Sequence, residues 1–426
     1  MNTFFDIAII GGGASGLISA ISSSINSKNN LKIAVFEKED KIGKKLLATG
    51  NGRCNLSNTN INDDFYYGSC KDNALTLFKT YNSTYITNYF KTLGLFAKTD
   101  DCGRIYPLSN CATSVLDILK MQCTKHNVEI ICNCDITDIS KTTKNTYTLS
   151  SSSFTFECNK IILTVGGKAS VSKFTNNGYS LLEQLSIKQA PIFPSLSPIL
   201  VKEKFIKSLK GNRTNAKVTL NYVTQNNKNK SIFEIGEVQF TEKALSGICV
   251  FQLSRFTNEF FTHSTINGEK TKSVTISVDL FPTFSNNELL SILMNRFKSN
   301  KTLPIETLLF GLINYKIANS IYKICGIKDL NNELSTLNIK TIENIAYNLK
   351  NLTFNILDGT DNFMNAQVTS GGVLASECDF STMQYVKDKN IFFAGEILDL
   401  DGLCGGYNLH WAWVSGIIVG ENATKN

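Results

Sequence analysis

Apolar and polar positions along the chain follow different periods, and the period changes between segments. Short apolar runs typical of buried strands, each followed by a segment with helical spacing, fill the chain up to about residue 190 and again after residue 366. Between them, Ile276 and Val278 belong to a strict alternation of apolar and polar residues, which predicts a strand with one buried face. From Asn286 the period becomes helical, with Leu289 and Leu293 on one face. The pattern predicts α/β ends around a β-rich part and a helical part.

The first apolar run leads directly into a glycine-rich turn, Gly11-Gly12-Gly13-Ala14-Ser15-Gly16, and then into a helical segment. In a dinucleotide-binding unit the first glycine permits the turn. The second lets the backbone approach a pyrophosphate, and the third lets the helix pack on the strand. A second predicted strand ends at Glu37, where a carboxylate binds a ribose hydroxyl. This order of features favours an adenine-dinucleotide site over a purely structural turn.

Further glycine-rich loops follow other predicted elements. One is Gly50-Asn51-Gly52-Arg53-Cys54-Asn55, and another runs from Asp401 through Gly405-Gly406-Tyr407-Asn408 into an apolar helix. A predicted strand at 160–165 ends in Gly166-Gly167, and glycines at such a place allow a ligand to approach the backbone. That pair lacks the G-x-G-x-x-G spacing. The chain therefore has one dinucleotide turn, and we expect no second Rossmann domain for NAD(P)H.

Composition narrows the class of protein. The net charge is +7, but its lysines are spread without a basic run interleaved with aromatic residues, so we expect no nucleic-acid partner. Twelve scattered cysteines and only three histidines give no spacing typical of a metal site. No apolar run reaches the roughly 18 residues that span a membrane. The N-terminal stretch lacks a basic leader, so we expect a cytoplasmic protein that acts on a small molecule.

Two motifs stand near the two ends of the chain: the Gly50–Asn55 loop with Lys44-Lys45 before it, and the segment from Gly395-Glu396 to Asn408-Leu409-His410-Trp411. They resemble the motifs of one bacterial flavoprotein family, the aminoacetone oxidase-like NAD(P)/FAD-dependent oxidoreductases, which also includes a reductase of unsaturated 3-oxo bile acids. The resemblance implies an α/β fold with a Rossmann-like FAD-binding domain (1–190 and 366–426). An inserted β-barrel-like domain (191–284 and 351–365) and a small helical subdomain (285–350) interrupt it.

The resemblance also implies FAD as the cofactor, held by residues from both ends of the chain. The glycine turn would bind the pyrophosphate and Glu37 the adenosine ribose, while Glu396 matches the position that binds ribityl hydroxyls. Backbone at Ile136 would face the adenine. The residues that we expect to bind the cofactor are Gly11, Gly13, Ala14, Ser15, Gly16, Glu37, Lys38, Gly43, Lys44, Asn51, Gly52, Arg53, Cys54, Asn55, Ile136, Gly166, Glu396, Asp401, Gly406, Tyr407 and Asn408.

No catalytic residue is assigned from the sequence. His410 begins a predicted helix, but relatives more often have glutamine at this place, which argues against an essential proton transfer. A redox disulfide between Cys54 and Cys404 is the alternative to two packing thiols. We favour packing thiols, because disulfide reductases place their two cysteines close together in the sequence.

The expected function is an FAD-dependent oxidoreductase with NAD(P)H as a transient electron donor. The substrate would be a conjugated enone of the 3-oxo bile acid or steroid type. The run Ser246-Gly247-Ile248, without a proline, resembles the reductase branch of the family. One alternative is an O₂-dependent oxidase of a small amine such as aminoacetone. Others are a flavin-dependent RNA-modifying enzyme and a non-catalytic flavin-binding sensor.

Overall fold

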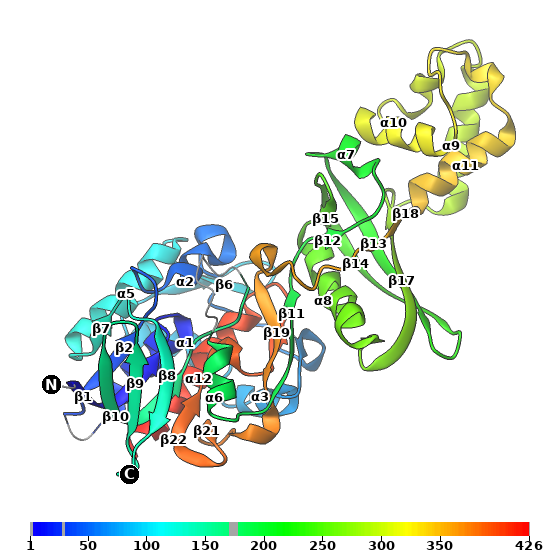
Figure 1. Ribbon diagram of the computed structural model, residues 1–426. Helices are drawn as coiled ribbons and strands as arrows, with labels where there is room; N and C mark the ends of the chain where they lie inside the picture. The colour runs from blue at the N-terminus through cyan, green and yellow to red at the C-terminus, as the bar shows by residue number, and fades with distance from the viewer. Residues whose placement is uncertain (1–2, 28–29, 170–177, 426) are drawn as a thin grey trace. The chain divides into compact units, whose positions relative to one another are not determined.

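The computed structural model describes residues 3–27, 30–169 and 178–425. Contacts divide the chain into two compact units (Figure 1). The first, here the outer unit, comprises Met1–Ile192 and Val368–Asn426; the second, the inserted unit, comprises Phe193–Gln367. The chain passes between them at strands β11 (Gln189–Ser195) and β19 (Val368–Val373), which pair with each other.

A mixed sheet, parallel from β22 to β7, forms the centre of the outer unit. Its strand order is β20-β21-β22-β10-β1-β2-β7, and β1 (Thr3–Ile10) pairs in parallel with β10 (Thr155–Leu163) and β2 (Ile33–Phe36). The β2 residues are all buried, which is why the sequence shows a continuous apolar run there. The expected α/β fold with a Rossmann-like domain is confirmed.

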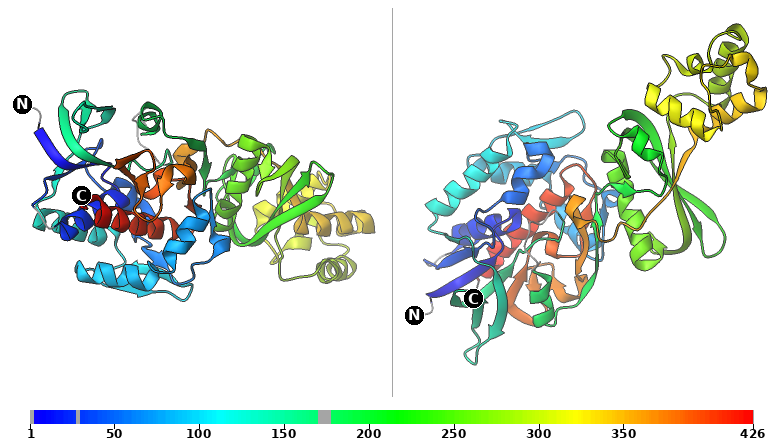
Figure 2. Two further views of the ribbon diagram at one scale, coloured as in Figure 1. Left: turned by 90° about the horizontal axis from the view of Figure 1, so that it is seen from below. Right: turned by 45° about the horizontal axis from the view of Figure 1, so that its top comes forward.

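Helices α1 (Ala14–Asn26) and α12 (Tyr407–Ala423) pack side by side in the outer unit, as the dark blue and red helices of Figure 2 show. Gly416 and Gly420 make this close packing possible. A Cβ atom at Gly416 would collide with Ile18, and one at Gly420 would collide with Ser22. The hydroxyl of Ser22 donates to the carbonyl oxygen of Ile417 at 3.0 Å. The first and last described helices thus form one layer.

The remaining elements of the outer unit surround this sheet and helix pair. Its other strands are β3 (Ser57–Asn58), β4 (Tyr66–Tyr67), β5 (Ala97–Thr99), β6 (Arg104–Pro107), β7 (Glu129–Ile131), β8 (Ile136–Lys141), β9 (Tyr147–Ser151), β20 (Cys378–Asp379), β21 (Gln384–Tyr385), β22 (Asp388–Phe393) and β23 (Asp401–Gly402). Its other helices are α2 (Lys44–Ala48), α3 (Lys71–Phe78), α4 (Ser83–Thr92), α5 (Ala112–Lys125) and α6 (Tyr179–Gln184).

The inserted unit is built on an antiparallel sheet of order β12-β15-β14-β13-β17-β16, with β18 paired to β17. Its strands are β12 (Ile199–Leu200), β13 (Arg213–Thr224), β14 (Asn229–Phe240), β15 (Ala244–Ser246), β16 (Thr265–Ile266), β17 (Glu269–Asp279) and β18 (Leu352–Asn355). Its helices are α7 (Ile206–Leu209), α8 (Ile248–His263), α9 (Asn286–Ser299), α10 (Tyr315–Ile324) and α11 (Ile339–Lys350). The alternation around Ile276 and Val278 matches β17, where both side chains are fully buried.

Helix α8 was not expected from the sequence, which indicated only β-rich structure in this region. Its 16 residues contain many aromatic and β-branched side chains, which favour strands in isolation. Packing decides the outcome, because α8 lies against β14 and buries Leu253 and Phe256. A tertiary contact thus overrides the local preference.

Candidate functional site

The glycines of the turn between β1 and α1 have two different roles: Gly11 and Gly16 are required by close packing, whereas Gly13 borders open space. Gly11 has φ +111°, and a Cβ atom there would collide with the carbonyl oxygen of Thr164. A Cβ at Gly16 would collide with the carbonyl oxygen of Gly11. Gly13, by contrast, has no atom within 4 Å of an added Cβ. Gly13 also precedes α1, whose first turn has no side-chain cap and no acidic residue. Unpaired N–H groups and open space therefore coincide, as anion binding requires.

Glu37 lies directly behind this turn, at the end of β2. Its carboxylate accepts hydrogen bonds from the N–H of Gly12 at 2.8 Å and of Glu39 at 2.9 Å. Lys38 follows it in the sequence, and Lys44 forms an ion pair with Glu39 at 2.7 Å. Backbone donors therefore fix the orientation of the carboxylate and leave lone pairs for ribose hydroxyls.

Residues after β7 close the same region from another side. The N–H of Cys134 donates to the carbonyl oxygen of Glu37, and the N–H of Asn133 donates to that of Glu39, both at 2.9 Å. Ile136 is buried at the start of β8, two residues further on. The expected adenine-facing segment thus follows a loop attached to the Glu37 region. The sequence did not single out that loop.

The Gly50–Asn55 loop has an unusual backbone. Gly50, Asn51, Gly52 and Cys54 all have φ between 55° and 80°, a range that side chains disfavour. The guanidinium of Arg53 lies 4.6 Å from the centre of the Tyr106 ring. Strain of this kind persists only where surrounding contacts enforce it, and it is frequent at ligand sites.

Residues that begin α12 lie beside the end of this loop. A Cβ on Gly406, whose φ is +99°, would come within 2.7 Å of Asn55 Oδ1. That oxygen is buried and has no hydrogen-bond partner among the described residues. The amide of Asn408 instead bonds the backbone N–H and carbonyl of Gly402 and braces the loop. Asp401 is buried in β23, and Tyr407 is the first residue of α12.

Glu396 links the two ends of the chain. Its carboxylate lies 2.7 Å from Lys45 Nζ and accepts a hydrogen bond from the N–H of Thr369 at 2.8 Å. A Cβ on the preceding residue, Gly395, would come within 2.5 Å of Ser15 Oγ at the start of α1. The glycine turn and the Gly395-Glu396 segment therefore meet. Nothing in the sequence pattern indicates that Lys45 and Thr369 are partners of Glu396.

The Gly166-Gly167 segment lies against the same residues. A Cβ on Gly167 would come within 2.5 Å of Glu396 Oε1 and of Thr369 Oγ1. Gly166 has φ +71° and no atom within 4 Å of an added Cβ. The predicted ligand-facing glycine therefore borders open space.

His410 is enclosed by protein. Its side chain is fully buried, its Nδ1 lies 2.9 Å from Ser57 Oγ, and burial lowers its pKa to about 3. A neutral, enclosed imidazole supports the packing of α12 on β3. We therefore infer no proton transfer by His410.

No disulfide joins any of the twelve cysteines, all of which lie among the described residues. Burial raises the pKa of Cys54 to about 12, so this thiol is neutral at physiological pH. We expect Cys54→Ser and Cys404→Ser each to keep most of the rate of flavin reduction, because Cys54 is buried and we interpret both thiols as packing groups. Stopped-flow absorbance at the flavin band measures this rate. Loss of turnover in both variants, with cofactor bound and fold intact, would instead indicate thiol chemistry.

These residues fit FAD by two features of this structure. The open, uncapped start of α1 suits a pyrophosphate, and the buried, unpartnered Asn55 Oδ1 suits an N–H or hydroxyl donor of the cofactor.

Over the described residues, no group of three or more histidine, cysteine or acidic side chains is arranged to hold a metal ion. No described helix combines the length and the apolar character of a membrane span.

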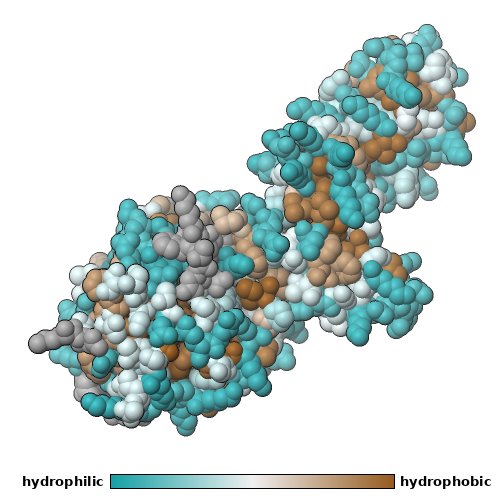
Figure 3. All heavy atoms as spheres, in the orientation of Figure 1, coloured by the Kyte–Doolittle hydropathy of each residue, from teal (hydrophilic) through white to brown (hydrophobic). Residues whose placement is uncertain are grey.

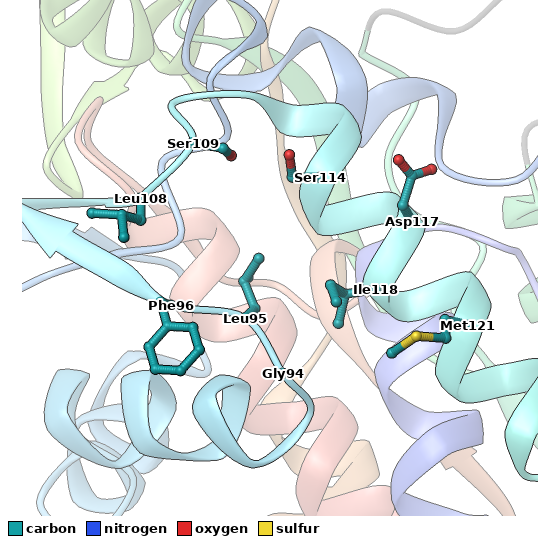
Figure 4. Close-up of a pocket in the computed structure, with 9 residues that line it drawn as sticks. All are labelled: Gly94, Leu95, Phe96, Leu108, Ser109, Ser114, Asp117, Ile118 and Met121. Carbon is teal, nitrogen blue, oxygen red and sulfur yellow. The ribbon is translucent and has the colours of Figure 1, made fainter.

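A separate hollow of about 580 Å³ lies on the outer unit beside α5 (Figure 4). Apolar side chains form most of its wall, and Asp117 borders it. Its lining residues are Gly94, Leu95, Phe96, Leu108, Ser109, Ser114, Asp117, Ile118 and Met121. None of these is an expected cofactor-binding residue.

Comparisons with known proteins cover almost the whole chain. The family model described as HI0933-like protein Rossmann domain matches residues 5–422. A 3-dehydro-bile acid delta(4,6)-reductase of Clostridium scindens is 31% identical over 420 residues, 98% of this chain and 99% of that protein. A ribosomal RNA dihydrouridine synthase of Haemophilus influenzae is 25% identical over 421 residues, 97% of each chain. Among solved structures, a 3-ketosteroid delta1-dehydrogenase of Sterolibacterium denitrificans matches with a TM-score of 0.48 and 12% identity, over 99% of this chain and 100% of that chain.

Proposed function

This chain belongs to the HI0933-like Rossmann family and is an FAD-dependent oxidoreductase, and from that premise we propose that it reduces a carbon–carbon double bond conjugated to a carbonyl group. NAD(P)H is the proposed electron donor, and an enone of the 3-oxo bile acid or steroid type is the leading substrate class. The reaction adds two electrons and two protons: a hydride to the β-carbon and a proton to the α-carbon.

The observation that carries this proposal is the chemistry common to two full-length relatives. A delta(4,6)-reductase of a 3-dehydro-bile acid acts on double bonds in conjugation with the 3-oxo group. Formation of dihydrouridine saturates the C5–C6 bond of uracil, which is conjugated with the C4 carbonyl. The two substrates differ in size and polarity, yet the reacting group is the same. Conjugated reduction is therefore the activity that best accounts for both relatives.

The chain's own residues have distinct parts in this proposal. FAD, when bound, supplies the two-electron hydride transfer. The unpaired N–H groups at the start of α1 bind its pyrophosphate, and Glu37 orients its ribose. The start of α12 also lacks a side-chain cap, so its N–H groups and positive helix end stabilise negative charge placed before them.

The decisive experiment is anaerobic reduction of the purified holoenzyme by NADH and by NADPH. Different oxidants are then added separately to the reduced enzyme. We expect one nicotinamide to bleach the flavin absorbance. A 4-ene-3-oxo steroid should then restore that absorbance faster than O₂ does. Rapid O₂-dependent oxidation of aminoacetone, with no reduction by either nicotinamide, would contradict the proposal and favour an amine oxidase.

Uridine within ribosomal RNA is the second candidate substrate. The similarity to the dihydrouridine synthase, which extends over 97% of both chains, favours it. An unmodified ribosomal RNA transcript, offered to the NAD(P)H-reduced enzyme, tests it through the appearance of dihydrouridine in nuclease digests.

A further inference from the structure

The excess positive charge of the chain is concentrated in the inserted unit. Residues 193–367 contain 20 Lys and Arg against 14 Asp and Glu, a net charge of +6, whereas the rest of the chain has 23 against 22. The net charge of the whole chain does not reveal this uneven distribution between the two units. This distribution points to a polyanionic partner for the inserted unit.

Packing of α7 on α10 gathers lysines from three separate segments. The hydroxyl groups of Ser208 and Ser320 lie 3.0 Å apart and join the two helices, which adjoin in Figure 1. Lys316 and Lys323 lie four residues before and three residues after Ser320, so they share its helix face. The third segment joins through Lys243, whose carbonyl oxygen accepts from the N–H of Val201 at 3.1 Å.

We name this surface the lysine cluster. Its seven exposed lysines are Lys202, Lys204, Lys207, Lys210, Lys243, Lys316 and Lys323. Two acids adjoin them: Glu242 pairs with Lys207 and Lys210, and Glu203 accepts hydrogen bonds from Asn355. The remaining five lysines have no ion pair in the described structure. Figure 3 shows hydrophilic side chains over α7, at the edge of the unit's apolar area.

We propose that the lysine cluster binds the phosphate backbone of RNA. Tyr315, 58% exposed at the start of α10 beside Lys316, supplies a face on which a base can stack. This inference rests on the proposed function, because a uracil base within the bound RNA has the conjugated double bond that the reaction requires. A free bile acid, with one carboxylate, does not need such a cluster.

The test compares two variants of the full holoenzyme that lose the same charge. The first changes Lys204, Lys243, Lys316 and Lys323 to Gln, and none of these has a described ion pair to lose. The matched control changes four exposed lysines of the outer unit, Lys91, Lys98, Lys120 and Lys125, to Gln. Fluorescence anisotropy with an unmodified, single-stranded ribosomal RNA fragment measures affinity from 50 to 200 mM salt.

We expect the cluster variant to bind the RNA at least tenfold more weakly at 50 mM salt. The slope of its log binding constant against log salt concentration should become shallower by about 3, since each of the four lost phosphate contacts in a single strand contributes roughly 0.7 to that slope. The control should retain the wild-type affinity and slope. Equal losses in both variants, no RNA binding by the wild type, or tighter binding to vesicles of anionic phospholipid would overturn the inference. Reduction of the steroid enone, measured in parallel, reports separately on the proposed function and should be equal in both variants.

Discussion

Replacing Gly13 by valine is expected to abolish FAD binding while the cofactor-free protein keeps its fold. The structure has no atom within 4 Å of a Cβ at this position, and the φ of −84° suits any residue. The new Cβ therefore meets no protein atom, and the valine side chain fills the space where a pyrophosphate must approach the N–H groups of α1. FAD content after acid precipitation, with circular dichroism as the control for folding, measures the effect.

Two neighbouring substitutions separate this effect from general damage. Gly13→Ala adds only one methyl group, so an intermediate FAD occupancy is expected. Gly16→Ala should impair folding itself, because its methyl group collides with the carbonyl oxygen of Gly11. Full FAD occupancy in Gly13→Val would show that the cofactor's pyrophosphate lies elsewhere. The same acid treatment of the wild type should release all its FAD, since no covalent link is expected.

Gly416→Val is expected to destabilise the outer unit by about 3 kcal/mol or more, the upper end of overpacking effects. Its Cβ would collide with Ile18 and come within 2.8 Å of the carbonyl oxygen of Ser15. The carbonyl oxygen of Ser15 belongs to the backbone and cannot move without shifting α1, so FAD affinity should fall as well. Urea unfolding of the cofactor-free protein gives the free energy.

Asn422→Val, on a half-exposed position of the same helix, is the matched control. It introduces the same β-branched side chain into α12 and removes the hydrogen bonds of Asn422 with the carbonyl oxygen of Ile418 and with Lys425, so a change of about 1 kcal/mol is expected. If both variants lost the same free energy of unfolding, the effect would come from helix propensity. The close approach of α1 and α12 would then be unimportant for stability.

Local patterns were sufficient to predict the parts of the outer unit that lie close together in the sequence. Strand β1, the glycine turn, helix α1 and Glu37 occupy one continuous segment. The buried strand is apolar and the tight turn consists mainly of glycine, so the residue types alone indicate these conformations. The alternation in β17 was equally clear, because one face of the sheet is buried. These features need no knowledge of distant residues.

Pairs that join the ends of the chain could not be predicted in the same way. Lys45 and Glu396 are 351 residues apart, and nothing in either segment specifies the other. Helix α8 was missed because its stability comes from packing on β14. The lysine cluster was missed for a related reason. Its three segments have ordinary compositions, and only the contacts among α7, α10 and β12 bring them together.

The pairing of α1 with α12 has a consequence for the order of events on the ribosome. Ser22 and its partner Ile417 are 395 residues apart, and the whole inserted unit is synthesised between them. Domains generally fold as units during synthesis, so the inserted unit can fold while α1 still lacks its neighbour. The apolar face of α1 then stays available to chaperones until α12 emerges. The nascent chain can complete its nucleotide pocket only after α12 has been synthesised.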